Sequence, residues 1–237
     1  MSNSAWTLFI LNSPYDKFLM SGESTDSLYR NVMADIIFIL GESRATYQDS
    51  AKGGAQFIII EFAKEYGITI SQCYEMFFNH SRYGMDLARK RLKILEERGY
   101  LLKGKPWDTN KTVYYIGRIP STHRILLADF YSELIYEGAV IMEFIPEYKT
   151  SELRADALIR YIYKGYEVIQ FIEVILTHKL NIEKYERLKD TGEVQNKYDI
   201  FPSLIILDHN PIAYKSNNIK VAYVNHNLDN FKNVVLP

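Results

Sequence analysis

The hydrophobic pattern in the middle of the chain predicts three helices followed by a β-hairpin. Apolar residues recur there at steps of three and four, and each run ends at a glycine or a polar turn. Ser71 is expected to cap the second helix. The sequence "PWDTN" joins the two β segments and is rich in turn-forming residues. The elements expected are helices over 50–67, 68–78 and 83–98 and strands over 100–105 and 111–118.

This order of elements is the layout of a winged helix-turn-helix, which we assign to residues 51–119. Beyond Ile119 the pattern changes, and Pro120 ends the hairpin while Ser121 or Thr122 can cap a new helix. Residues 120–237 then alternate helix and strand, so the overall expectation is an α+β or α/β chain. The elements expected there are helices over 121–138 and 177–192 and strands over 139–146, 155–165, 166–176 and 203–210.

Residues 1–50 form an N-terminal extension with a short expected strand, "WTLFIL", and an expected helix near 24–40. It carries no motif that indicates a role. The single cysteine, Cys73, excludes an internal disulfide, and no His/Cys group has the spacing of a zinc site. No basic region precedes the apolar N-terminal run, and no stretch approaches the roughly 20 apolar residues of a membrane span. We therefore expect a cytoplasmic protein with no membrane contact.

Charge separates the third helix and its hairpin from the rest of the chain. The chain has a formal net charge of −1, but residues 79–118 contain ten positive and four negative side chains, a net charge of +6. In the helix, one stripe is apolar and is expected to face the core. A second stripe with the same period is mostly basic and is expected to face outwards. The apolar stripe comprises Met85, Ala88, Leu92 and Leu95, and the basic stripe Arg82, Asp86, Arg89 and Lys93.

A basic helix followed by a basic hairpin fits double-stranded DNA, because a helix enters the major groove and lysines bind phosphates. The alternatives are a solvated helix face and a protein-docking module. Trp107, at the hairpin tip, is expected to anchor the hairpin to its own domain rather than to contact a sugar. Tyr83 suits either a base contact or packing. The residues expected to contact DNA are Arg82, Tyr83, Asp86, Arg89, Lys90, Lys93, Lys103, Lys105 and Lys111.

A carboxylate, Glu173, interrupts the apolar strand "YEVIQFIEVIL", and Asp156 stands in the strand before it. A buried carboxylate needs a compensating partner. Two carboxylates on neighbouring strands can bind Mg²⁺, which prefers oxygen ligands. The structural alternative is that Glu173 is held by Arg154, Arg160 or a backbone amide, while a turn satisfies Asp156.

The stretches "RADALIRY", "FIEVILTHKLNIEKYERL" and "FPSLIILDHN", together with the helix-rich segment before them, resemble the replication-relaxation family of plasmid and mobile-element proteins over residues 55–210. The resemblance implies a second domain similar to the PD-(D/E)xK restriction-endonuclease core. It implies catalytic roles for Glu133, Asp156 and Glu173, with Asp156 and Glu173 as candidate Mg²⁺ ligands.

Ile175 occupies the position where the endonuclease pattern has lysine. Lys179, in the next helix, is the candidate replacement, with His178 as a further donor. The missing lysine favours a degenerate domain without cleavage, in which no cofactor is needed and Glu173 is structural.

The function expected from these features is sequence-specific binding of double-stranded DNA by a protein of a plasmid, phage or other mobile element, in replication, transfer or transcriptional regulation. The alternatives are a metal-dependent endonuclease that uses Asp156 and Glu173, and a protein-interaction module. A homodimer is expected, because helix-turn-helix proteins commonly pair on palindromic sites. The helices near 24–40 and 121–137 are its candidate interface.

Overall fold

The computed structural model describes residues 47–177, 180–209 and 216–237. The described chain is mixed α+β and divides into two compact units, one that ends at Gly138 and one that begins at Ala139. We call residues 47–138 the helical unit and the described residues from 139 to 237 the sheet unit. The expected strand and helix within residues 1–50, and also Lys179, lie outside the described residues.

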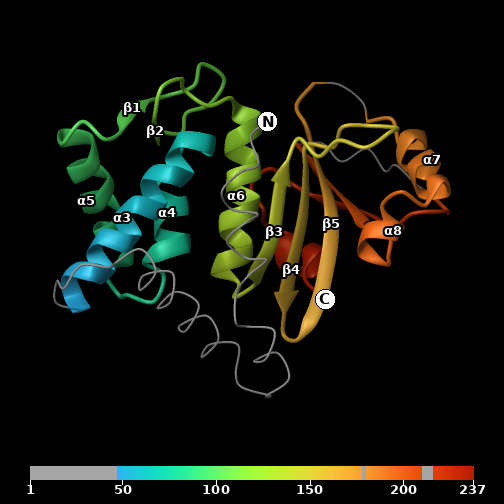
Figure 1. The fold of residues 1–237 in the computed structure, drawn as a ribbon. Helices are drawn as coiled ribbons and strands as arrows, with labels where there is room; N and C mark the ends of the chain where they lie inside the picture. The colour runs from blue at the N-terminus through green and yellow to red at the C-terminus, as the bar shows by residue number, and fades with distance from the viewer. Residues whose placement is uncertain (1–46, 178–179, 210–215) are drawn as a thin grey trace. The chain divides into compact units, whose positions relative to one another are not determined.

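The helical unit has the expected order of three helices, a hairpin and a further helix (Figure 1). Side chains from the three helices and the hairpin form one apolar core, in which Ile59, Leu92 and Leu101 are almost completely buried. The elements are α3 (Tyr47–Tyr66), α4 (Ile70–Phe77), α5 (Gly84–Glu97), β1 (Leu102–Gly104), β2 (Val113–Tyr115) and α6 (Thr122–Tyr136).

The link between α3 and α4 is set by local geometry. Gly67 has φ +69°, and a Cβ there would lie 2.6 Å from atoms of both Pro120 and Val113, so glycine is required. The N-cap of α4 is Thr69, not Ser71 as expected. The Thr69 hydroxyl accepts a hydrogen bond from the Gln72 backbone amide, and the Gln72 side chain accepts one from the Thr69 amide. This reciprocal capping box fixes where α4 begins.

The boundary expected at Ile119–Pro120 falls one helix before the boundary between the compact units. Helix α6 packs on α4 and α3, and its residues Ala128, Tyr131 and Ile135 contribute to the core of the helical unit. The helix cap at Ser121 is confirmed, because its hydroxyl accepts a hydrogen bond from the Arg124 amide. A new helix therefore starts where expected, but it completes the helical unit.

The sheet unit is built on five strands in the order β3-β4-β5-β6-β7. Strands β3, β4 and β5 are antiparallel neighbours, whereas β6 and β7 run parallel to β5. Strand β7 and helix α9 were not expected from the sequence. The elements are β3 (Val140–Pro146), β4 (Ala157–Tyr163), β5 (Tyr166–Ile175), α7 (Glu183–Thr191), α8 (Gln195–Tyr198), β6 (Ser203–Asp208), β7 (Val221–Val224) and α9 (Phe231–Val235).

Helices cover both faces of this sheet. On one face, Phe171 of β5 contacts Tyr185 of α7 edge-on, with 5.4 Å between the ring centroids. On the opposite face, the Tyr161 hydroxyl and the Gln170 amide both donate hydrogen bonds to the backbone carbonyl of Val235 in α9. The alternation of side chains along β5 thus brings Glu173 to the face that α7 covers.

Candidate functional site

The outward face of α5 is the strongest candidate for a binding surface. Ala88, Leu92 and Leu95 are buried, as expected. Met85, expected in the same apolar stripe, is 40% exposed. Its place toward the core is taken by Gly84, where an added Cβ would lie 2.1 Å from the Phe78 carbonyl oxygen. The close approach of α5 to the preceding turn therefore rotates Met85 out of the core.

The charged residues expected on this face are all exposed. Two of the basic ones have acidic neighbours on the same helix, with Arg89 Nη1 lying 2.5 Å from Asp86 Oδ1 and Lys93 Nζ lying 3.6 Å from Glu97 Oε1. Exposed pairs of this spacing stabilise a helix by only about 0.5 kcal/mol, so phosphate groups can displace them. Asp86 is thus the ion-pair partner of Arg89 and not an independent contact to DNA.

The hairpin extends the basic surface. Lys103 Nζ lies 4.0 Å from Glu96 Oε2, which places β1 beside the C-terminal half of α5. Among the described residues, Arg82, Lys90 and Lys105 have no acidic partner within 4.0 Å, and all three are exposed. We use "basic surface" for Arg82, Arg89, Lys90, Lys93, Lys103 and Lys105.

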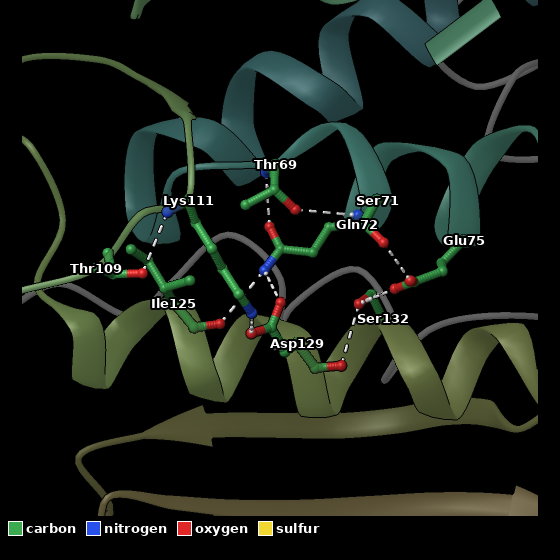
Figure 2. A network of polar contacts seen from close by, with 9 residues as sticks. All are labelled: Thr69, Ser71, Gln72, Glu75, Thr109, Lys111, Ile125, Asp129 and Ser132. Atoms are coloured by element: carbon green, nitrogen blue, oxygen red, sulfur yellow. Dashed lines mark hydrogen bonds and ion pairs between the residues drawn. The ribbon is translucent and has the colours of Figure 1, made fainter. Parts of the chain in front are cut away.

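Lys111 was expected to contact DNA, but its ammonium group is bound within the helical unit. Lys111 Nζ lies 2.6 Å from Asp129 Oδ2 of α6, and the Asp129 side chain is only 12% exposed (Figure 2). Burial raises the pKa of Asp129, and the Lys111 charge opposes that rise. Lys111 therefore ties the end of the hairpin loop to α6.

Gln72 connects the same carboxylate to the start of α4 (Figure 2). Its Nε2 donates to Asp129 Oδ1 at 2.7 Å and to the Ile125 carbonyl at 3.3 Å. A second link runs from the Ser132 hydroxyl to Glu75 Oε2 at 2.6 Å. Sequence reasoning missed this network. The available signal was the capping-box spacing from Thr69 to Gln72, which marks a polar residue that is held at a helix start.

Replacement of Lys111 by methionine should destabilise the helical unit by about 1–3 kcal/mol, because it leaves a buried carboxylate without its charged partner. Urea unfolding would measure the loss. Protonation of Asp129 relieves the unpaired charge, so the deficit should shrink as the pH falls. The double variant Lys111→Met/Asp129→Asn should recover most of the stability, because an amide oxygen still accepts from Gln72. Equal losses in the single and double variants would contradict this role of the ion pair.

The two aromatic residues considered from the sequence as possible DNA contacts, Tyr83 and Trp107, are both exposed. Trp107 was expected to anchor the hairpin, but its side chain is 96% exposed, so that expectation is wrong. Tyr83 is 65% exposed, and the Arg82 guanidinium lies over its ring at 5.9 Å from the centroid. Tyr83 is therefore available for an external contact rather than buried in the core.

In the sheet unit, the register of β4 and β5 brings Asp156 and Glu173 together. Ala157 pairs with Ile172, so the preceding Asp156 lies across from Glu173. Glu173 is buried, with 8% of its side chain exposed, and Tyr185 donates its hydroxyl to Glu173 Oε1. The Val174 amide donates to Asp156 Oδ2 at 2.7 Å. The side-chain partner of Glu173 is thus Tyr185 of α7, which was not expected from the sequence.

Arg154 and Arg160, the partners proposed for Glu173, form other pairs. Arg154 is bound to Glu147, and Arg160 Nε lies 2.5 Å from Glu167 Oε1. The signal for the true partner was the spacing of Tyr185 and Leu188 in α7, which places both on the buried face of that helix. A buried tyrosine hydroxyl requires a hydrogen-bond partner.

Contacts within the sheet unit hold both carboxyl groups of the pair. Burial, followed by the Asp156 charge, raises the pKa of Glu173 to about 8, so its carboxyl group is mostly protonated at neutral pH. One Glu173 oxygen accepts from Tyr185 and one Asp156 oxygen accepts from Val174. Ile175, at the position of the missing lysine, is buried in the apolar core of this unit. Across the described ranges, no three acidic, histidine or cysteine side chains gather as metal ligands.

The other expected catalytic residues lie outside the sheet unit or outside the described residues. Glu133 belongs to α6, in the helical unit, whereas Asp156 and Glu173 belong to the sheet unit. Lys179 and His178 fall outside the described residues. Of the set Glu133, Asp156, Glu173 and Lys179 expected from the sequence, the described part of the sheet unit contains Asp156 and Glu173, which the strand register brings together.

Scans against protein-family models, curated proteins and solved structures found no match to this chain. Within the described ranges, no helix combines the length and apolar character needed to cross a membrane.

Proposed function

We propose that the chain binds double-stranded DNA through α5 and the β1–β2 hairpin, which act as the recognition helix and wing of a winged helix-turn-helix. The observation that carries the proposal is the basic surface, in which six cationic side chains are exposed in the turn before α5, on α5 and β1, and in the loop that follows β1. A helix of this size fits the major groove, and the hairpin lysines reach neighbouring phosphates.

Three features of the helical unit support DNA as the ligand. Helix α4 and the turn to α5 hold the recognition helix on a core that includes Met76, Ala88 and Leu92. Of the acidic neighbours of the basic surface, Asp86 and Glu97 are exposed and Glu96 is half-buried, so no fully buried charge must be separated before phosphate binds. The Lys111–Asp129 pair fixes the hairpin loop on α6, which lowers the entropy lost on binding.

The wider role follows the sequence resemblance. We propose that the protein acts on the DNA of a plasmid, phage or other mobile element, in replication, transfer or transcriptional control. The sheet unit, with α7 and α9 on its opposite faces, serves in this proposal as a restriction-endonuclease-like scaffold without cleavage. Pairing of two copies on a palindromic site is part of the same proposal.

The direct test is a salt series. A fluorescent duplex that contains the DNA upstream of the protein's own coding sequence, and a shuffled duplex of equal length, would be titrated with the full chain. Anisotropy should report binding of both duplexes that weakens steeply with salt, with a slope of log affinity against log salt of up to about −5 for six phosphate contacts. Tighter binding of the upstream duplex would support sequence specificity. Absence of salt-dependent binding to either duplex would reject the proposal.

A further inference from the structure

Trp107 is the most exposed large hydrophobic side chain among the described residues, with 96% of its surface accessible. It lies in the loop between β1 and β2, directly after the buried Pro106. Tryptophan combines a large apolar surface with a single polar N–H group, and it is enriched where a protein contacts a partner. A tryptophan that has almost no contact in its own chain is therefore a candidate contact residue.

The loop that carries Trp107 is held at both ends. On the β1 side, Pro106 is buried and accepts a hydrogen bond from the Thr109 amide at 3.4 Å. On the β2 side, the Lys111 amide donates to the Thr109 hydroxyl at 3.2 Å, and the Lys111 ammonium is bound to Asp129. The loop that carries the indole is thus already held in place. Little conformational entropy of the loop is therefore lost when the indole contacts a ligand.

The charges around Trp107 favour a polyanion over an apolar protein surface or a membrane interior. Lys105, two residues before it, is exposed and belongs to the basic surface, as does Lys103 of β1. The loop leads directly from α5 and β1, so the indole lies on the same polypeptide segment as the proposed phosphate contacts. On the other side of Trp107, Asp108 is exposed and acidic. An aromatic ring that follows two exposed cations along the chain suits a nucleic acid, because the ring packs on sugars and base edges while the cations bind phosphates.

We propose that Trp107 is a non-ionic DNA contact, which packs its indole ring against sugar and base edges in the groove beside the one that α5 enters. This inference rests on the proposed function and adds a specific affinity determinant to it. Unlike the lysines of the basic surface, Trp107 releases no counterions, so its contribution should not depend on salt.

Two measurements on the full chain test this assignment. Trp6 is the only other tryptophan in the sequence, so the variant Trp6→Phe leaves Trp107 as the sole tryptophan fluorophore. Addition of an unlabelled duplex should shift or quench its emission and protect it from acrylamide. In parallel, anisotropy of a labelled duplex should show that Trp107→Ala weakens binding by about fivefold to a hundredfold with an unchanged salt slope.

Tyr166 supplies the matched control. It follows the tight turn between β4 and β5 and is 66% exposed, so Tyr166→Ala removes an exposed aromatic ring from a different hairpin. This variant should bind DNA like the wild type. Normal affinity of Trp107→Ala together with unchanged Trp107 emission on bound DNA would overturn the inference and leave the proposed function intact. An emission change with a protein partner but not with DNA would also overturn it. Failure of the wild type to bind DNA would reject both.

Discussion

Charge reversal at Arg82 and Lys90 should lower the affinity for duplex DNA about a hundredfold or more near 0.1 M salt, because each change replaces a phosphate attraction by a repulsion. Both residues are exposed, and neither has an acidic partner within 4.0 Å among the described residues. Arg82→Glu/Lys90→Glu therefore breaks no ion pair that holds the helical unit. The slope of log affinity against log salt should become shallower by about two. Fluorescence anisotropy of a labelled duplex over a salt series would measure both effects.

The control for this variant must change the net charge equally. Lys149 and Lys220 are exposed residues of the sheet unit, and Lys149→Glu/Lys220→Glu produces the same change of four charges. Because net charge alone also affects association with DNA, only a difference between the two variants locates the site. Equal losses of DNA affinity in the two variants would show that α5 is not a specific DNA-contact site. Loss of a protein partner with unchanged DNA affinity would favour the interaction-module alternative.

Helix α5 illustrates what sequence pattern captures well. The apolar period from Ala88 to Leu95 predicted the helix, its buried face and its exposed cations, because all three follow from the helical repeat. Met85 was wrongly expected to face the core, because the hydrophobic period of a helix does not show how closely two elements approach each other. That approach is set by Gly84, which lies against the Phe78 carbonyl.

The sequence pattern failed mainly to predict which side chains interact when they are distant along the chain. Lys111 and Asp129 are separated by 18 residues, and no local pattern distinguishes a lysine that binds phosphate from one that binds a buried carboxylate. The partner of Glu173 was missed for the same reason. By contrast, the contact of Asp156 with Glu173 was within reach of sequence reasoning. Lys164 and Gly165, both with positive φ, form a two-residue turn, and such a turn fixes the register of its hairpin.

The register of β4 and β5 affects the ionisation of two carboxyl groups in the sheet unit. With Tyr163 opposite Tyr166, seven further residues along each strand bring Asp156 opposite Glu173. Two carboxylates this close cannot both ionise without large cost, so at neutral pH the pair holds a proton. The structure therefore places a pair of carboxyl groups where β4, β5 and α7 meet, and burial together with the Asp156 charge raises the pKa of Glu173 there.

Stability should accordingly decrease as the pH rises. The pKa of Glu173 is about 8 in the folded chain, above its ordinary value of 4.5, so the folded state binds more protons between these values. The contribution of this group to stability is complete below pH 4.5 and is lost progressively as the pH rises toward 8. Since one pKa unit corresponds to about 1.4 kcal/mol, the total loss is on the order of a few kcal/mol.

The variant Glu173→Gln should remove this dependence and make the protein more stable than the wild type at pH 8. Its amide oxygen accepts from Tyr185 as the carboxyl group does, and its amide nitrogen can donate to Asp156 without any titration. Urea unfolding from pH 5 to pH 8.5 would measure the change. Glu167→Gln is the control, because Glu167 is an exposed residue of the same strand that pairs with Arg160. The slope of the unfolding free energy against pH should be the same in Glu167→Gln as in the wild type.

A third variant and a metal titration separate the shared proton from a cation site. Asp156→Asn removes the neighbouring negative charge, so the pKa of Glu173 should fall and the pH dependence should shrink, though less than in Glu173→Gln. A Mg²⁺ ion bound to both carboxylates would instead stabilise the wild type at pH 8 and leave Glu173→Gln unaffected. We expect Mg²⁺ to produce no such difference, because Tyr185 and the Val174 amide already occupy one oxygen of each carboxyl group. A Mg²⁺-dependent gain confined to the wild type would restore the endonuclease interpretation.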